Sequence, residues 1–178
     1  MLELAIEAGE LFNEKTGEFV TVDRQTLQLE HSLYSIAKWE SKWKKPFLSN
    51  SRREEKTTEE MIDYIRCMMI DEHADPMVVY ALNASHMKQI NDYINDPMTA
   101  TWFKEKDRPS NEIVTSEIVY YWMVSAQVPF ECQYWHFNRL MTLLKVVSIK
   151  NQPAKKMSKS DILKQNRAIN HARRKPHI

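Results

Sequence analysis

The chain has 178 residues, of which 43% are hydrophobic and 28% are charged, and its formal net charge is +1. This length and composition are typical of one globular domain with an appendage, and not of a disordered or membrane-embedded chain. Gly9 and Gly17 are the only glycines. A P-loop, a dinucleotide-binding fingerprint and a nucleophile elbow each need glycines at a strand-to-helix turn. The sequence therefore excludes these three kinds of enzyme site.

We expect a protein of the cytoplasm with no membrane segment. The longest uninterrupted apolar run is Ile118–Val124, much shorter than the ~20 residues that cross a bilayer. The first ten residues carry Glu3 and Glu7 and no basic residue, which argues against a secretory signal peptide. Cys67 and Cys132 are too few for a disulfide framework, so we expect buried, reduced thiols.

Charge is distributed unevenly along the chain. Between Lys150 and Ile178 there are nine Lys and Arg residues against Asp161 alone, a net charge of +8. Residues 1–149 therefore carry −7 of the total of +1. This pattern indicates an acidic body with a basic tail.

The first thirty residues have the alternating pattern of short strands. Apolar residues alternate with polar ones in residues 2–6, and the pattern continues at 11–13, 19–22 and 26–30. Gly17 suits a left-handed turn position, so a β-hairpin is predicted around it. Such a small antiparallel sheet needs helices on its apolar face.

From Ser32 onward the apolar period becomes helical. The sequence predicts a helix that ends before Pro46, a second that begins at a Thr57/Glu60 capping box, and a short helix that begins at Asp75-Pro76 and runs to Leu82. A further helix begins near Ser85, with its inward positions at Met87, Ile90, Tyr93 and Ile94. Residues 98–103 are left unassigned, and residues 104–111 read as a loop.

Residues 112–150 are the most aromatic stretch, and they contain two helical patterns on either side of Pro129. The short connection predicts an antiparallel helical hairpin whose rings form the core. A polar helix follows Pro153. The expected fold is α+β and predominantly α-helical, with an N-terminal sheet (1–31) packed on a helical body (32–150) and a basic, partly flexible helical tail (151–178).

Cys132 and His136 are four residues apart on a predicted helix and could supply two zinc ligands, with Glu131 and His73 as further ligands. The favoured alternative is a core thiol and a hydrogen-bonded histidine, because no second ligand pair has matching spacing. We expect no metal and no cofactor.

Two histidines have acidic neighbours in the sequence. His31 follows Glu30, and His73 lies beside Glu72 and Asp75, so either could act as an acid–base partner if a cleft brought the groups together. Sequence neighbours seldom face each other, and no nucleophile with an identifiable base emerges. We therefore expect a protein that is not an enzyme.

Aromatic residues are interleaved with lysines in residues 38–47. This combination serves nucleic-acid stacking or protein hot spots, but we favour a core stripe whose edges are covered by lysine stems. The residues are Trp39, Trp43 and Phe47 with Lys38, Lys42, Lys44 and Lys45.

The segments LQLEHSLYSIAKWESKWKKPFLS, TTEEMIDYIRCM, INDYINDPMTATWF, EIVTSEIVYYWMV, VPFECQYWHFNRLMTLLKV and IKNQPAKKMSKSDILKQNRAIN together resemble the tail assembly chaperones of siphovirus-type, long-tailed bacteriophages. The resemblance covers nearly the whole chain. It implies a non-enzymatic protein of the host cytoplasm that binds the helical tape measure protein and keeps it soluble during tail tube assembly. Contact with the tail tube protein and self-association are further possible partnerships.

A chaperone of this kind must present apolar surface to amphipathic helices, and methionine provides adaptable surface for this. On chemistry alone, the expected partner-binding residues are Trp39, Trp43, Met61, Met68 and Met69. The alternative function is a virion structural or nucleic-acid-associated protein, although nucleic acid is the less favoured partner. It would use a basic tail formed by Lys155, Lys156, Lys159, Arg167, Arg173 and Arg174.

Overall fold

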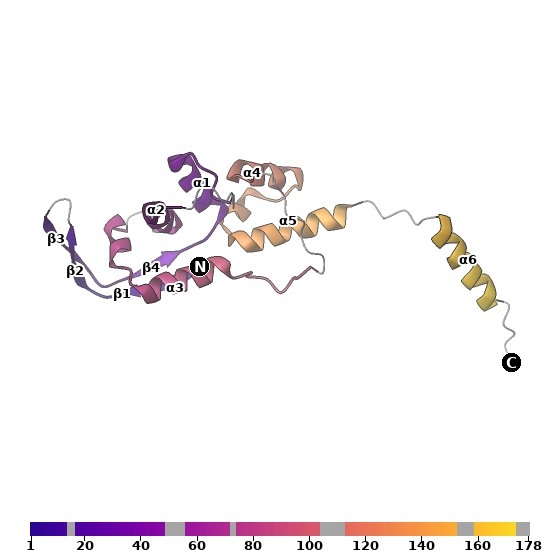
Figure 1. The fold of residues 1–178 in the computed structure, drawn as a ribbon, viewed down its shortest axis with the longest axis horizontal. Helices are drawn as coiled ribbons and strands as arrows, with labels where there is room; N and C mark the ends of the chain where they lie inside the picture. The colour runs from indigo at the N-terminus through magenta and orange to yellow at the C-terminus, as the bar shows by residue number, and fades with distance from the viewer. Residues whose placement is uncertain (14–16, 49–55, 72–73, 104–112, 153–158, 174–178) are drawn as a thin grey trace. The chain divides into compact units, whose positions relative to one another are not determined.

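The structure is a computed structural model that describes residues 1–13, 17–48, 56–71, 74–103, 113–152 and 159–173. Figure 1 shows short β-strands near the N-terminus followed by helices for most of the chain. The fold is α+β and predominantly helical, which confirms the predicted class.

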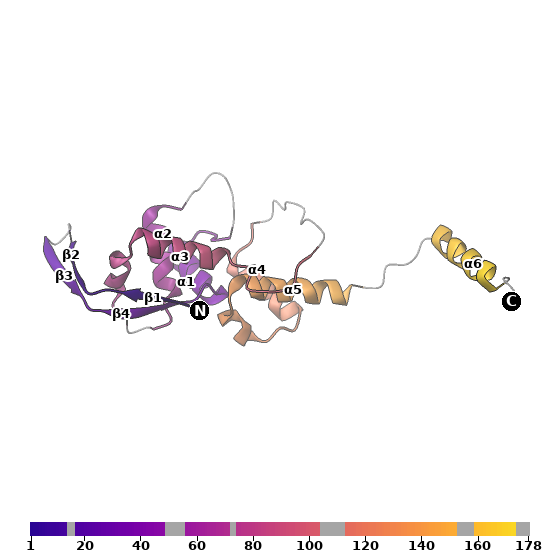
Figure 2. The ribbon, with the colours of Figure 1, turned by 90° about the horizontal axis from the view of Figure 1, so that it is seen from below.

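The four N-terminal strands form two antiparallel pairs. Figure 2 shows the two pairs end to end in space, with β2 and β3 beyond β1 and β4. β1 (Leu2–Ile6) pairs with β4 (Gln25–Leu29), and β2 (Gly9–Asn13) pairs with β3 (Glu18–Val22). The predicted hairpin is confirmed, and Gly17 has the positive φ of 72° that its place in the turn predicts. Alternation places Leu4, Ile6, Leu27 and Leu29 inward, where they are buried.

The end of the second helix extends this sheet. Met69 forms an antiparallel bridge with Leu29. The N–H of Glu30 donates to the Met68 carbonyl at 2.8 Å, and the N–H of Ile70 donates to the Gln28 carbonyl at 3.1 Å. Part of the free edge of β4 is therefore covered by the chain that leaves the helix.

Side-chain caps begin the first two helices. Ser32 and Ser35 form a reciprocal capping box at α1 (Leu33–Trp43), and Thr57 and Glu60 form the predicted one at α2 (Thr58–Met68). Lys44 ends α1 in a left-handed conformation with φ of 56°. In both helices, hydrogen bonds between residues three apart in the sequence define where the helix begins.

The remaining helices include two short 3-10 segments. Asp75 accepts a hydrogen bond from the N–H of Met77 at the start of η1, as the Asp-Pro pair predicts. Met87 is exposed, although it was predicted to point inward, while Ile90 and Tyr93 are buried as predicted. The elements are η1 (Pro76–Ala81), α3 (Ala84–Asn95), α4 (Ser116–Ser125), η2 (Phe130–Tyr134), α5 (Phe137–Asn151) and α6 (Lys159–Arg173).

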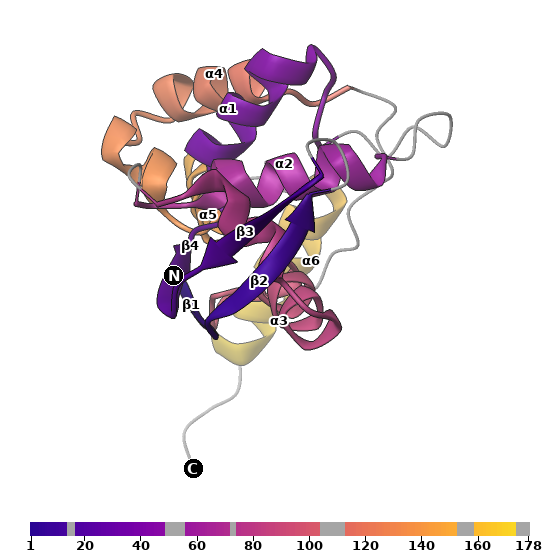
Figure 3. The same ribbon diagram turned by 90° about the vertical axis from the view of Figure 1, so that its left-hand side faces the viewer.

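One hydrophobic core joins the strands to the helices. Figure 3 shows α1 and α2 on one side of the strands. Its largest fully buried side chains are Trp39 and Tyr64, which come from α1 and α2. The other members are Leu4, Ile6, Val22, Leu27, Leu29, Leu33, Ile36, Ile65, Met68, Val78, Val79, Ile90, Tyr93, Val119, Met123, Val128, Cys132, Phe137, Leu140 and Leu144.

The predicted helical hairpin in residues 112–150 is wrong in its detail. α4 packs mainly against α1. The separate helix η2 lies between α4 and α5, and the chain is extended at Trp135 before α5 begins. The buried residues of α4 are Ser116, Val119 and Met123, and the opposite face of this helix lies outside the core.

The chain divides into two units, Met1–Val147 and Ser148–Ile178. The N-terminal sheet and the helices from α1 to α4 belong to the first unit, and α6 belongs to the second. Within the residues that the structure describes, none of the helices has the length and apolar character needed to cross a membrane.

Candidate protein-binding site

Trp39 and Trp43 join α1 to α2 through their indole groups. Trp39 is 1% exposed, and its Nε1–H donates to the Glu60 carbonyl at 2.8 Å. The Nε1–H of Trp43 donates to Asp63 Oδ2, also at 2.8 Å. Both indole N–H groups therefore have hydrogen-bond acceptors on α2.

The lysines around these rings bind within the first unit. Lys42 pairs with Asp63, and Lys45 pairs with Glu60 at 2.8 Å. The Lys45 hydrogen bond is the main reason why the pKa of Glu60 is lowered. Lys56 lies 4.4 Å from the centre of the Phe47 ring. The core part of the favoured interpretation is confirmed, because Trp39 is buried and Trp43 and Phe47 pack against the core.

The expected groove of tryptophans and methionines therefore needs correction. Trp39 is a core residue, so its side chain does not form an exposed surface. Met68 is also buried, although it lines the pocket described below. Trp43, Met61 and Met69 are partly exposed. The helical periodicity correctly identified an apolar stripe on α1, but an apolar stripe at helical spacing more often belongs to the core than to a binding surface.

An exposed apolar face does occur on α4, in the stretch where the sequence predicted core. The buried residues of this helix are Ser116, Val119 and Met123. The opposite side carries Tyr121, which is 68% exposed, and Val124 one turn further on. A surface helix usually places polar residues on its outer face, so the exposed apolar residues make this face a candidate binding surface.

Four rings come together from α4, η2 and α1. The centroids of Tyr120 and Phe130 are 6.2 Å apart, and those of Tyr34 and Tyr134 are 5.2 Å apart. The Tyr120 hydroxyl donates to Gln133 Oε1 at 2.7 Å. Burial raises the pKa of Tyr120, and the nearby hydroxyls of Tyr134 and Tyr34 raise it further. We call Tyr34, Tyr120, Phe130 and Tyr134 the aromatic surface.

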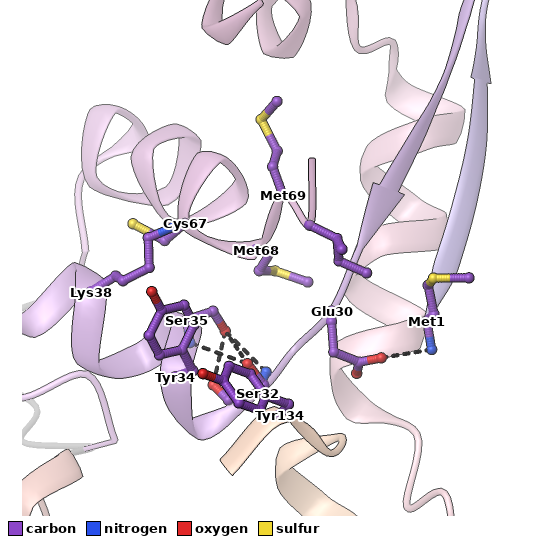
Figure 4. Close-up of a pocket in the computed structure, with 11 residues that line it drawn as sticks. Met1, Glu30, Ser32, Tyr34, Ser35, Lys38, Cys67, Met68, Met69 and Tyr134 are labelled. Carbon is purple, nitrogen blue, oxygen red and sulfur yellow. Dashed lines mark hydrogen bonds and ion pairs between the residues drawn. The ribbon is translucent and has the colours of Figure 1, made fainter. Parts of the chain in front are cut away.

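A pocket of about 420 Å³ adjoins the aromatic surface, and Tyr34 and Tyr134 belong to both (Figure 4). Such a volume accommodates one or two large side chains or a small molecule. Helix α1, the end of α2 and the chain between β4 and α1 supply most of its walls. It is lined by Met1, Glu30, Ser32, Tyr34, Ser35, Lys38, Cys67, Met68, Met69, Ile70 and Tyr134.

Two charged residues, Lys38 and Glu30, line the pocket together with Met68 and Met69. Figure 4 shows Lys38 and Glu30 on opposite sides of Met68. The Glu30 carboxylate accepts a hydrogen bond from the Tyr93 hydroxyl at 2.6 Å and pairs with the Met1 amino group at 2.8 Å. Burial and this hydrogen bond raise the pKa of Tyr93.

Cys67 provides a thiol on the pocket wall. Burial is the main reason why its pKa rises to about 11. The thiol therefore stays protonated near neutral pH, where it behaves as a small apolar group and not as a nucleophile or metal ligand.

The zinc site considered from Cys132 and His136 does not form. Cys132 lies in η2, and His136 lies beyond it and bridges to Ser32, so the two do not share one helix. His136 Nε2 hydrogen-bonds the Tyr93 carbonyl at 3.0 Å. Among the residues that the structure describes, no group of three His, Cys, Asp or Glu side chains could hold a metal ion.

His31 faces histidine and tyrosine instead of the acid–base partner considered for it. Its Nδ1 hydrogen-bonds the Tyr64 hydroxyl at 2.5 Å, and its ring centroid is 5.2 Å from that of His136. Burial, and secondarily His136, lower its pKa to about 3. Burial also lowers the pKa of His136. The proposed partners His73 and Glu72 lie outside the described residues.

The basic tail is described only in part. Arg167 is exposed on α6. Lys159 and Arg173 are the two end residues of that helix. Lys155, Lys156 and Arg174 lie outside the described residues.

Sequence reasoning missed the aromatic surface because apolar periodicity does not say which face of a helix its neighbours cover. The one available signal was composition, since α4 is apolar on nearly every side. A comparison with protein-family models, with curated proteins and with solved structures gives no match.

Proposed function

We propose that this protein is a phage tail assembly chaperone that binds the helical tape measure protein and keeps it soluble while the tail tube assembles. The observation that carries the proposal is the aromatic surface joined to an apolar pocket on the first unit. The resemblance noted in the sequence supports the identity of the partner.

The chemistry of this surface suits an amphipathic helix. Tyrosine and phenylalanine rings bury large apolar areas at low cost in side-chain entropy. Methionines on the pocket wall can adapt to partner side chains of different shape. A helix that lies across the rings would place residues at i, i+3, i+4 and i+7 on the surface, and one of them can enter the pocket.

Chaperoning follows from the same contact. A long amphipathic helix that has no partner exposes an apolar stripe and aggregates. Covering this stripe keeps the helix soluble without any covalent chemistry. The tape measure protein would be released when its own assembly partner covers the stripe instead.

Co-expression with the tape measure protein tests the proposal. The full chain should raise the soluble yield of the partner and co-purify with it. The variants Phe130→Ser and Tyr134→Ser remove rings that are 54% and 56% exposed, and should reduce both effects. Tyr80→Ser is the matched control, because Tyr80 is 50% exposed and lies on η1. No gain in soluble partner with the unaltered chain would refute the proposal.

A further inference from the structure

Lys38 is a cation at the pocket without a carboxylate partner in the described part of the chain. Its Nζ lies 5.5 Å from the centre of the Tyr34 ring, and its side chain is partly buried. Lys42 on the same helix binds Asp63, and Lys45, just beyond the C-cap of that helix, binds Glu60. The charge of Lys38 is therefore still available to a ligand, whereas theirs are neutralised.

The pocket residues around Lys38 are mainly apolar. Tyr34 lies one helical turn before it, and Met68 and Met69 line the same pocket. The Cys67 thiol, also on this wall, is close enough for Lys38 to oppose the rise of its pKa. On the other side of Met68, Glu30 is already engaged by Tyr93 and Met1. The polar partner that the pocket still lacks is therefore an anion beside Lys38.

We propose that the pocket binds one apolar side chain and one carboxylate of a partner helix, and that Lys38 forms an ion pair with the carboxylate. This inference rests on the proposed function and specifies which residues of the partner helix are recognised. Side chains three or four residues apart on a helix lie about 5–6 Å apart on one face. A long apolar residue such as Leu or Met can thus enter the pocket while Asp or Glu, one turn away, reaches Lys38.

The ion pair supplies selectivity more than total affinity. An exposed ion pair adds little to total affinity, but the partly buried position of Lys38 reduces the screening of this pair by water and salt. Reversal of the lysine charge replaces attraction with repulsion. We expect a change of about tenfold in Kd for an acidic peptide.

A displayed library of helical peptides tests the inference on the full chain. The library keeps one Leu position constant and randomises the positions three and four residues on either side. Selection should enrich Asp or Glu at one of these positions. With the Lys38→Glu variant the same selection should enrich Lys or Arg at that position, and with Lys38→Met the charge preference should disappear while Leu-dependent binding persists.

Binding constants of individual peptides complete the test. The Lys38→Glu variant should bind the acidic peptide with about tenfold lower affinity. A peptide that carries the Glu→Lys change should recover the lost affinity. Lys88→Glu on α3 is the matched control, because this exposed lysine does not line the pocket, and it should leave both constants unchanged. Thermal unfolding of each variant checks that it is folded, and Lys38→Met serves if Lys38→Glu is not.

Two negative results have different meanings. If the chain solubilises the tape measure protein but no charge preference appears, or the preference survives in Lys38→Met, the inference is wrong and the proposed function stands. If the chain neither solubilises the tape measure protein nor enriches any peptide, both are wrong.

Discussion

The Glu40 carboxylate of α1 accepts a hydrogen bond of 2.7 Å from the backbone N–H of Ser116, the first residue of α4. Thr115 precedes this helix at the N-cap position, but its side chain makes no capping bond. Glu40 also accepts a 2.7 Å hydrogen bond from the N–H of Phe47. One buried carboxylate thus caps a helix that lies far away in the sequence, and it positions the aromatic face of α4.

Glu40→Ala should lower the free energy of unfolding by about 2–4 kcal/mol, because it leaves two N–H groups without their acceptor. Glu40→Gln should cost less, since its amide oxygen can still accept one hydrogen bond. Urea unfolding measures both losses. Glu10→Ala, on the exposed side of β2, is the control and should stay within about 0.5 kcal/mol of the unaltered chain. Equal stability of Glu40→Ala and Glu10→Ala would contradict this role of Glu40.

Stability should fall as the pH drops below about 6.5, the ordinary pKa of histidine. The pKa of His31 is about 3 in the folded protein, so only the unfolded chain gains a proton at this residue as the pH falls from 7.5 to 5. The folded state loses about 2 kcal/mol through His31 over this range. His136 adds to the loss, because its pKa is also lowered by burial.

Urea unfolding at pH 7.5, 6 and 5 measures this dependence. His31→Asn should be less stable at pH 7.5 because it disturbs the contact with Tyr64, but its stability should change less with pH. The same pH dependence in His31→Asn and in the unaltered chain would show that His31 is not its source.

Trp39→Phe should lower the free energy of unfolding by about 1–3 kcal/mol, because it removes a buried hydrogen bond and leaves space in the core. Its affinity for the partner should stay unchanged at a temperature where the variant is folded. Tyr134→Ser should show the opposite pattern, with little loss of stability and weaker binding. Denaturant unfolding and peptide titration separate the two, and a specific binding defect in folded Trp39→Phe would restore this tryptophan as a contact residue.

Removal of residues 153–178 should leave the melting temperature of the first unit unchanged. In the described part of the chain, the buried hydrophobic residues lie between Leu4 and Leu144. Calorimetry of the shortened and full chains tests this expectation. A marked drop in melting temperature would show that the removed residues contribute to its stability.

The same shortened chain tests the alternative of a nucleic-acid-associated protein. If the basic tail binds DNA, the affinity of the full chain should fall steeply with salt and be lost in the shortened chain. We expect no such binding at physiological salt. Salt-sensitive binding that requires residues 153–178 would favour the alternative.

The sequence by itself determined the local features of this protein. Strand alternation, the turn at Gly17, the Thr57/Glu60 capping box and the Asp75-Pro76 start depend on chemistry within a few residues, and each was predictable from it. The helical stripe also favoured a core position for Trp39, although the same residue was expected on chemical grounds to bind a partner.

Only the tertiary structure decided which apolar faces are covered. α4 has apolar residues on nearly all sides, so periodicity could not show that Tyr121 faces outward while Val119 and Met123 face α1. The pocket joins Tyr34 to Tyr134, and Glu40 caps α4 at Ser116, through contacts between segments far apart in the sequence. The physical reason is that the burial of a side chain depends on which other elements pack against it, and local sequence patterns do not specify those neighbours.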